Sequence, residues 1–180
     1  MERIWIGAVL MVLAAGPASA QAAKPAPVEA EPRSTTASFG DWVVRCERGS
    51  VGDKPVRTCE AAQSMRVQGQ ANPIAQFAIG RVAVGEPVRA TVVVPNNISL
   101  PSTVRVAADD KDTQPLELVW RRCLPGGCFA DAPTREDTLK HWRGLTEPGR
   151  IVFRNGSGQE VAIPISFRGL AQALEALAKS

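Results

Sequence analysis

Apolar and polar residues alternate along the first clearly patterned stretch of the chain. Trp42, Val44 and Cys46 fall on one side of an extended backbone, with the intervening positions on the other. A second segment starts at Cys59 and alternates in the same way. Because successive side chains of a strand point to opposite faces of the sheet, this period of two predicts strands with one buried face. The polar loop between the segments, residues 49–55, predicts that they form a hairpin.

Short strands are predicted at regular intervals along most of the remaining chain. They cover residues 74–84, 88–94, 103–107, 116–123, 150–154 and 159–167. Many short strands separated by turn residues are typical of β-sandwiches and small barrels. The predicted fold class is therefore mainly β, an antiparallel β-sandwich with a short helix and a C-terminal helix.

The two helices are predicted where the alternation stops. Thr134 and Asp137 have the spacing of a capping box, with Asp in place of the usual Glu, and indicate a short helix that ends near Trp142. Residues 170–179 repeat apolar side chains at the spacing of a packed helical face.

Two further signals concern the last strands. Residues 155–158, Asn-Gly-Ser-Gly, predict a hairpin turn because Asn and Gly accept positive φ angles. Pro164 lies in the last predicted strand and has no N–H to donate to a neighbour. Its strand is therefore predicted to lie at a sheet edge or to carry a bulge.

The N-terminal part of the chain is predicted to lie outside the folded domain. Residues 1–20 combine a basic Arg3, an uncharged apolar run and a closing Ala-Ser-Ala, which is the pattern of a cleaved signal peptide. The apolar run is shorter than the roughly 20 residues of a typical membrane span, so we expect no transmembrane segment after cleavage. Residues 21–37, rich in Ala and Pro, predict a flexible linker. Residues 38–180 then form one disulfide-bonded β domain.

Charge and composition argue against one class of partner. The chain has 21 basic and 18 acidic side chains, a formal net charge of +3, and only 5% aromatic residues. Proteins that bind nucleic acids typically have a clustered basic face, often with aromatic side chains on which bases stack. The charges here are interspersed, so we expect no nucleic-acid partner.

Four cysteines form an even set in a chain that is predicted to leave the reducing cytosol, Cys46, Cys59, Cys123 and Cys128. This context favours disulfides, although spacing alone allows three pairings. The Pro-Gly-Gly turn between Cys123 and Cys128 can bring these two together, and Cys46 and Cys59 both lie on the apolar side of neighbouring strands. We therefore predict the disulfides Cys46–Cys59 and Cys123–Cys128. The alternative is a four-thiolate zinc site, which prefers two close cysteine pairs where this chain has one.

Residue types that carry catalysis do not form a recognisable motif in this sequence. His141 is the single histidine, and a hydrolase would need it beside a pocket with a serine or a carboxylate. Ser157 lies in a hairpin turn, whereas a nucleophile elbow requires a strand-to-helix turn. Paired carboxylates, calcium loops, phosphate loops and dinucleotide motifs are not found either. We therefore predict no catalytic residue, no cofactor and no metal ligand.

Several segments together resemble the invasion-associated locus B family of exported bacterial proteins. The resemblance covers roughly residues 38–178 and rests on five segments, Phe39 to Trp42 followed by Cys46, Cys59-Glu60, Leu100-Pro101, Cys123 to Asp131, and Ile163 to Leu170 followed by Ala173-Leu174. It implies a non-enzymatic β protein in the periplasm or at the cell surface, and it supplies no catalytic residues.

The function predicted from these observations is protein binding by an exported envelope or surface protein. Its partner, an envelope or host-surface protein, is not identified by the sequence. The sheet edges and the loop around Gly126 and Gly127 are the segments expected to contact it. Two alternatives remain, a periplasmic chaperone or enzyme inhibitor that offers an edge strand near Pro164, and a hydrolase that uses His141.

Overall fold

The computed structural model describes residues 33–81, 83, 85–109 and 111–180. The predicted signal peptide, residues 1–20, and residues 21–32 of the predicted linker lie outside this part. The described chain has ten strands and two helices, β1 (Ser34–Phe39), β2 (Trp42–Val51), β3 (Lys54–Met65), β4 (Ala75–Gly80), β5 (Arg89–Val94), β6 (Val104–Ala107), β7 (Leu116–Leu124), β8 (Gly127–Pro133), α1 (Glu136–Arg143), β9 (Gly149–Arg154), β10 (Glu160–Ile165) and α2 (Leu170–Ala178).

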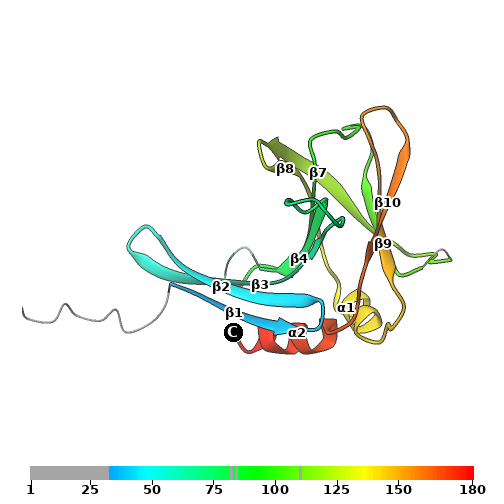
Figure 1. Cartoon of the computed structure of the whole chain (residues 1–180). Coiled ribbons are helices and arrows are strands. Elements are labelled where there is room, and N and C mark those ends of the chain that lie inside the picture. The colour runs from blue at the N-terminus through cyan, green and yellow to red at the C-terminus, as the bar shows by residue number, and fades with distance from the viewer. Residues whose placement is uncertain (1–32, 82, 84, 110) are drawn as a thin grey trace, which may run out of the picture. The chain divides into compact units, whose positions relative to one another are not determined.

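All ten strands belong to one antiparallel sheet, in the order β1-β2-β3-β4-β5-β8-β7-β6-β9-β10 (Figure 1). The sheet curls so that the end of β10 returns to β3, where the amide of Ser166 donates to the Gln63 side chain. The mainly β class is thus as predicted, but the two-layer sandwich is not. The sheet buries its apolar face by curling on itself, and the alternating pattern is the same for a curled sheet and for two stacked ones.

Aromatic side chains form the centre of the core. The ring of Phe77 on β4 lies edge-to-face with Trp42 on β2, at 5.6 Å, and with Trp142 on α1, at 5.8 Å. Phe167, just before α2, lies 6.1 Å from Trp142. Both helices are therefore attached to the concave face of the sheet, α1 through Trp142 and α2 through buried residues that include Leu174.

Strand β1 was not predicted from the sequence. Its residues Ser34–Phe39 pair with β2, so the domain begins inside the segment that was expected to be a flexible linker through residue 37. The turn that joins the two strands has Gly40 at φ 57°, the conformation that a tight type II′ hairpin requires at its first central position. The sequence Ser-Thr-Thr-Ala-Ser has no apolar alternation because all of residues 34–38 are exposed.

Strand β8 and the start of α1 also differ from expectation. β8 alternates between buried Cys128, Ala130 and Ala132 and less buried neighbours, and alanine gives a weak strand signal. The capping box is wrong, because α1 starts after Arg135 without a side-chain cap, and the Thr134 hydroxyl is buried without a hydrogen-bond partner.

The C-terminal predictions agree with the structure. The turn at residues 155–158 joins β9 to β10, and the Asn155 carboxamide oxygen accepts hydrogen bonds from the amides of Ser157 and Gln159. β10 is an edge strand, as Pro164 indicated. The C-terminal helix α2 ends one residue earlier than predicted.

Candidate interaction surface

Two disulfides each join a pair of cysteines that lie directly opposite one another on adjacent strands. Cys46 on β2 is bonded to Cys59 on β3, with Cα atoms 4.0 Å apart. Cys123 on β7 is bonded to Cys128 on β8, with Cα atoms 3.9 Å apart. The second disulfide closes the base of a tight turn and holds residues 124–127 in place.

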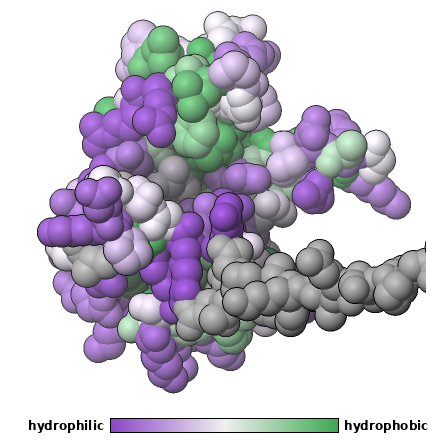
Figure 2. Space-filling view, turned by 90° about the vertical axis from the view of Figure 1, so that its left-hand side faces the viewer, coloured by the Kyte–Doolittle hydropathy of each residue, from purple (hydrophilic) through white to green (hydrophobic). Residues whose placement is uncertain are grey.

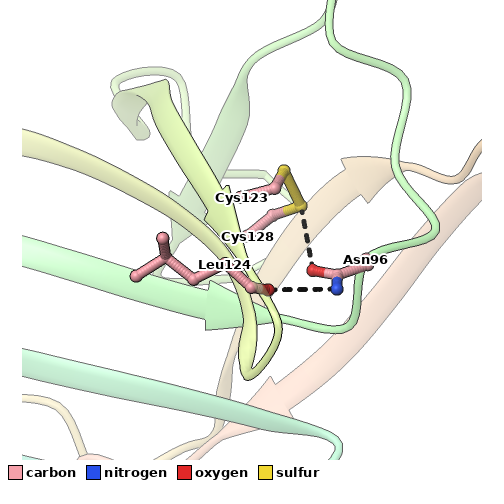
Figure 3. Close-up of a disulfide and its surroundings, with 4 residues drawn as sticks. All are labelled: Asn96, Cys123, Leu124 and Cys128. Atoms are coloured by element: carbon pink, nitrogen blue, oxygen red, sulfur yellow. Dashed lines mark hydrogen bonds between the residues drawn. A yellow bond between two sulfur atoms is a disulfide. The ribbon is translucent and has the colours of Figure 1, made fainter.

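Asn96 attaches this disulfide-closed turn to the end of β5 (Figure 3). Its carboxamide nitrogen donates to the Leu124 carbonyl oxygen at 3.0 Å. Its carboxamide oxygen lies 3.5 Å from the Cys128 sulfur; because a disulfide sulfur carries no proton, this is a close contact rather than a hydrogen bond. The turn is therefore restrained from both sides, by a covalent bond and by Asn96.

Gly127 permits the close approach of this turn to β5. Its φ angle is 141°, and a Cβ atom there would lie 2.7 Å from the Val94 carbonyl oxygen and 3.0 Å from a methyl group of Val93. A larger residue would push the turn away from β5. Gly126, its neighbour, has open space on the side where a Cβ would be added.

A hollow of about 550 Å³ lies beside the turn, between the start of β4, the end of β5 and the start of β8. Its lining residues come from three segments and none of them is charged, Asn72, Pro73, Ile74, Ala75, Gln76, Val93, Val94, Pro95, Asn96, Pro125, Gly126, Gly127 and Phe129. We call this surface the uncharged groove. In a chain with 22% charged residues, a hollow with this composition favours an uncharged ligand of mixed apolar and amide character.

Hydrophobic surface is not evenly spread over the molecule. Figure 2 shows hydrophobic residues gathered in the upper part of the face turned to the viewer, whereas hydrophilic residues predominate below. Leu124, at the disulfide-closed turn, is 45% exposed. The turn thus places an apolar side chain in solvent next to the uncharged groove.

Charged side chains on β7, β8 and β5 are held by aromatic or ionic partners. The Arg122 guanidinium lies 5.6 Å from the centre of the Phe129 ring, a cation–π distance. Asp131 on β8 forms ion pairs with Arg89 and Arg121. Although partial burial raises the pKa of Asp131, the hydrogen bonds from the two arginines outweigh it and hold that pKa below its usual value. The carboxylate therefore stays ionised.

His141 does not complete a catalytic pair among the described residues. It is exposed on α1 and lines a hollow of about 580 Å³ that also contains three carboxylates, Asp109, Asp112 and Asp137. Asp109 accepts a hydrogen bond from the backbone amide of Lys111 at 2.7 Å. Asp112 accepts hydrogen bonds from the backbone amides of Ala108 and Gln114, at 2.8 and 2.9 Å. Asp137 pairs with Arg135. None of the three carboxylates forms a hydrogen bond or ion pair with the imidazole in the described part of the chain, so the arrangement lacks the base–orienter hydrogen bond of an activated histidine.

Among the described residues, no group of three or more His, Cys, Asp or Glu side chains is arranged to hold a metal ion. Neither α1 nor α2 is long and apolar enough to cross a membrane.

The sequence had indicated the loop around Gly126 and Gly127 but not the groove beside it. The groove is assembled by the β3–β4 connection, the end of β5 and the β7–β8 turn. The pairing of β5 with β8 brings these segments together, and this pairing was not predicted. The sequence feature that could have indicated the groove is the pairing of proline with asparagine at the ends of the strands, Asn72-Pro73 and Pro95-Asn96.

The fold and this surface define a disulfide-bonded, mainly β protein with an uncharged groove beside a covalently closed turn. The family model of invasion-associated locus B (IalB) proteins matches residues 42–178. The chain belongs to this family.

The fold is also found in a solved structure. The crystal structure of invasion-associated protein B from Bartonella henselae matches with a TM-score of 0.64 and 20% sequence identity, over 81% of this chain and 95% of that chain. At this identity the likeness shows the fold alone. None of the curated proteins that were compared with the chain matches it.

Proposed function

We propose that the protein is exported to the periplasm or the outer surface and acts there by binding another protein rather than by catalysis. The signal-peptide pattern of residues 1–20 and the two disulfides support export, because disulfides persist in oxidising compartments. Membership of the invasion-associated family supports an envelope location.

The uncharged groove is the observation that carries the binding function. It lies beside a turn that is restrained by the Cys123–Cys128 disulfide and by Asn96. A restrained surface loses less conformational entropy when a partner binds, and a larger share of the contact energy then contributes to affinity. Phe129 and the prolines supply apolar contact area, and the carboxamides of Asn72 and Gln76 can hydrogen-bond a peptide backbone.

The occupant that fits this groove is an extended, uncharged segment of a partner protein. Because the lining residues hold no charge, a charged side chain buried against them would lose its hydration without gaining an opposite charge from the lining. The exposed Arg122 guanidinium beside Phe129 lies outside this lining. Exposed Leu124 at the rim extends the apolar contact beyond the groove itself.

A charge placed in the groove tests this function. Gln76 is half-buried in the groove wall, and its side chain makes no hydrogen bond to any described residue, so Gln76→Glu adds a charge with almost no change of shape. Cells producing the tagged protein are crosslinked alive, and captured proteins are identified by mass spectrometry. We expect Gln76→Glu to lose the specific partner and the exposed-surface control Gln114→Glu to keep it. Equal recovery by both variants would exclude the groove as the binding site.

The same experiment separates the alternatives. Capture of outer-membrane or host-surface proteins supports a role in adhesion, whereas capture of periplasmic clients or cell-wall enzymes supports a chaperone or an inhibitor. His141→Ala should leave the captured set unchanged, because His141 lies on α1 and is not part of the groove wall.

A further inference from the structure

The two edges of the sheet differ in how they are protected against pairing. In the β9–β10 hairpin the amide of Asn155 donates to the Gln159 carbonyl, so from this register the backbone groups of Glu160, Ala162 and Pro164 point to the free edge. Pro164 has no N–H, and Glu160 is a charged residue of this strand, although its carboxylate pairs with Arg105 on the other side of β9. Proline and charge are common means of preventing another strand from adding to an edge.

The edge formed by β1 has neither means of protection. In the β1–β2 hairpin the amide of Arg48 donates to the Arg33 carbonyl at 2.8 Å. From this register, alternate residues of β1 bond to β2, and the backbone groups of Ser34, Thr36 and Ser38 point outward. Residues 34–38 are all exposed, and none of them is charged or proline.

We propose that β1 pairs with the β1 strand of a second copy, so that the two sheets join into one. Antiparallel pairing about a two-fold axis at Thr36 sets Thr36 opposite Thr36 of the second copy, and Ser34 opposite Ser38. Every outward N–H and C=O of these residues then meets a partner, because outward-facing positions oppose outward-facing positions. This interface is independent of the uncharged groove.

The side chains of β1 suit pairing with an identical strand. On the outer face, threonine meets threonine and serine meets serine, and such hydroxyl pairs stabilise cross-strand contacts. On the other face, Thr35 meets Ala37. The flanking Arg33 meets Phe39 instead of a second arginine, so no like charges are directly opposed.

Repulsion between the Arg45 side chains of the two copies is also weak. Arg45 on β2 lies beside Thr36, and its copy lies three strand spacings away, about 14 Å. This distance exceeds the Debye length of about 8 Å in physiological salt. In addition, Arg45 forms an ion pair with Glu60 on β3, which reduces the repulsion further.

Cysteine substitution tests the predicted register. Thr36→Cys places the two new thiols opposite one another, at the Cα separation of about 5.5 Å that a disulfide accepts. We expect mild oxidation of the exported, purified protein to give a covalent dimer with Thr36→Cys. Ser34→Cys, on the same strand and face, should give little, because its partner in the second copy is Ser38. Equal crosslinking of the two variants would contradict this register.

Charge substitutions test the association without a covalent bond. The wild-type protein should sediment with twice the mass of one chain, and Thr36→Lys and Thr36→Glu should each sediment as single chains. An equimolar mixture of the two variants should recover the doubled mass, because lysine then opposes glutamate, and this recovery shows that both variants are folded. A wild-type protein that remains a single chain at the highest soluble concentration would overturn the proposed dimer.

Discussion

The side-chain amide of Gln63 makes two hydrogen bonds to the backbone of Ser166, 103 residues further along the chain. Its oxygen accepts from the Ser166 amide at 2.9 Å, and its nitrogen donates to the Ser166 carbonyl at 3.2 Å. The indole of Trp42 donates to the same carbonyl at 2.9 Å. Gln63 therefore serves as a substitute for a paired strand where the end of β10 meets β3.

Replacing Gln63 with leucine should destabilise the fold without changing its packing volume much. The substitution removes both bonds to Ser166 and leaves a backbone N–H without a partner, at a cost of about 2 kcal/mol. Urea unfolding followed by tryptophan fluorescence measures the loss. Gln76→Leu is the matched control, because the Gln76 side chain makes no hydrogen bond within the part of the chain that the structure describes. It should change stability by less than about 0.5 kcal/mol. Equal losses of stability in the two variants would show that the hydrogen bonds between Gln63 and Ser166 do not stabilise the fold.

Removal of either disulfide should lower stability, and the disulfide that closes the longer loop should have the larger effect. The Cys46–Cys59 bond has a sequence separation of 13 and should contribute about 3 kcal/mol by the chain-entropy model. The Cys123–Cys128 bond has a separation of 5 and should contribute about 2 kcal/mol. Paired alanine variants, compared by yield and urea unfolding, measure the two effects. Normal yield and stability after loss of the Cys46–Cys59 pair would contradict its structural role.

Peptide mapping without reduction checks the pairing itself. Proteolytic fragments that contain Cys46 and Cys59 should be recovered as one linked species, and so should those with Cys123 and Cys128. A fragment that links Cys59 to Cys123 would contradict the pairing.

Adjacent glycines of the disulfide-closed turn should respond differently to alanine. Gly127→Ala places a Cβ against the Val94 carbonyl at a positive φ angle and should cost about 2 kcal/mol. Gly126→Ala meets no atom within 4 Å and should leave stability unchanged. Thermal unfolding of the two variants gives the comparison, and similar melting temperatures would show that the turn does not depend on its contact with β5.

Asp41 should make the stability of the protein depend on pH in the acidic range. Hydrogen bonds from Arg168 and Ser166, in that order, hold the pKa of Asp41 below its usual value of 3.8, although partial burial opposes them. A carboxyl group with a lowered pKa stabilises the folded state above its unfolded pKa, and this contribution is lost as the pH falls through the folded pKa. Wild type should therefore be more stable than Asp41→Asn near neutral pH. The difference should begin to shrink as the pH falls towards 3.8 and should disappear only once the pH is below the lowered pKa of the folded state.

Urea unfolding over a range of pH values measures this difference. Arg168→Gln should abolish the same pH dependence, since Arg168 donates two hydrogen bonds to the Asp41 carboxylate. A difference between wild type and Asp41→Asn that persists unchanged at the lowest pH would contradict the assignment.

Local patterns in the sequence predicted the elements with strong apolar alternation and could not predict how the sheet is closed. β2 and β3 followed from their buried alternate residues. Pro164 predicted either a sheet edge or a bulge for β10, and the structure shows the edge. β1 was missed because an exposed edge strand has no buried face and hence no alternation. The curl depends on long-range contacts such as Gln63–Ser166, which have no local signature.

The candidate surface was predictable only in part for the same reason. The turn between Cys123 and Cys128 is a local feature, and its Pro-Gly-Gly sequence identified it. The groove needs residues 72–76 and 93–96 beside that turn, and only the order of strands in the sheet brings them together. His141 was considered for catalysis because it is the single histidine. Whether a histidine can act as a base depends on the side chains beside it, and these could not be predicted from the sequence.

Site-specific photo-crosslinking in living cells tests most directly whether the uncharged groove binds a protein partner. A photoreactive residue replaces Leu124, at the rim of the groove, or Leu100, which is 65% exposed on a separate loop. We predict a discrete adduct from position 124 that is not formed from position 100 and that is lost with Gln76→Glu. Its mapped partner segment should carry no charged residues. Equal labelling from both positions, or an adduct that persists with Gln76→Glu, would contradict the groove as the site of binding.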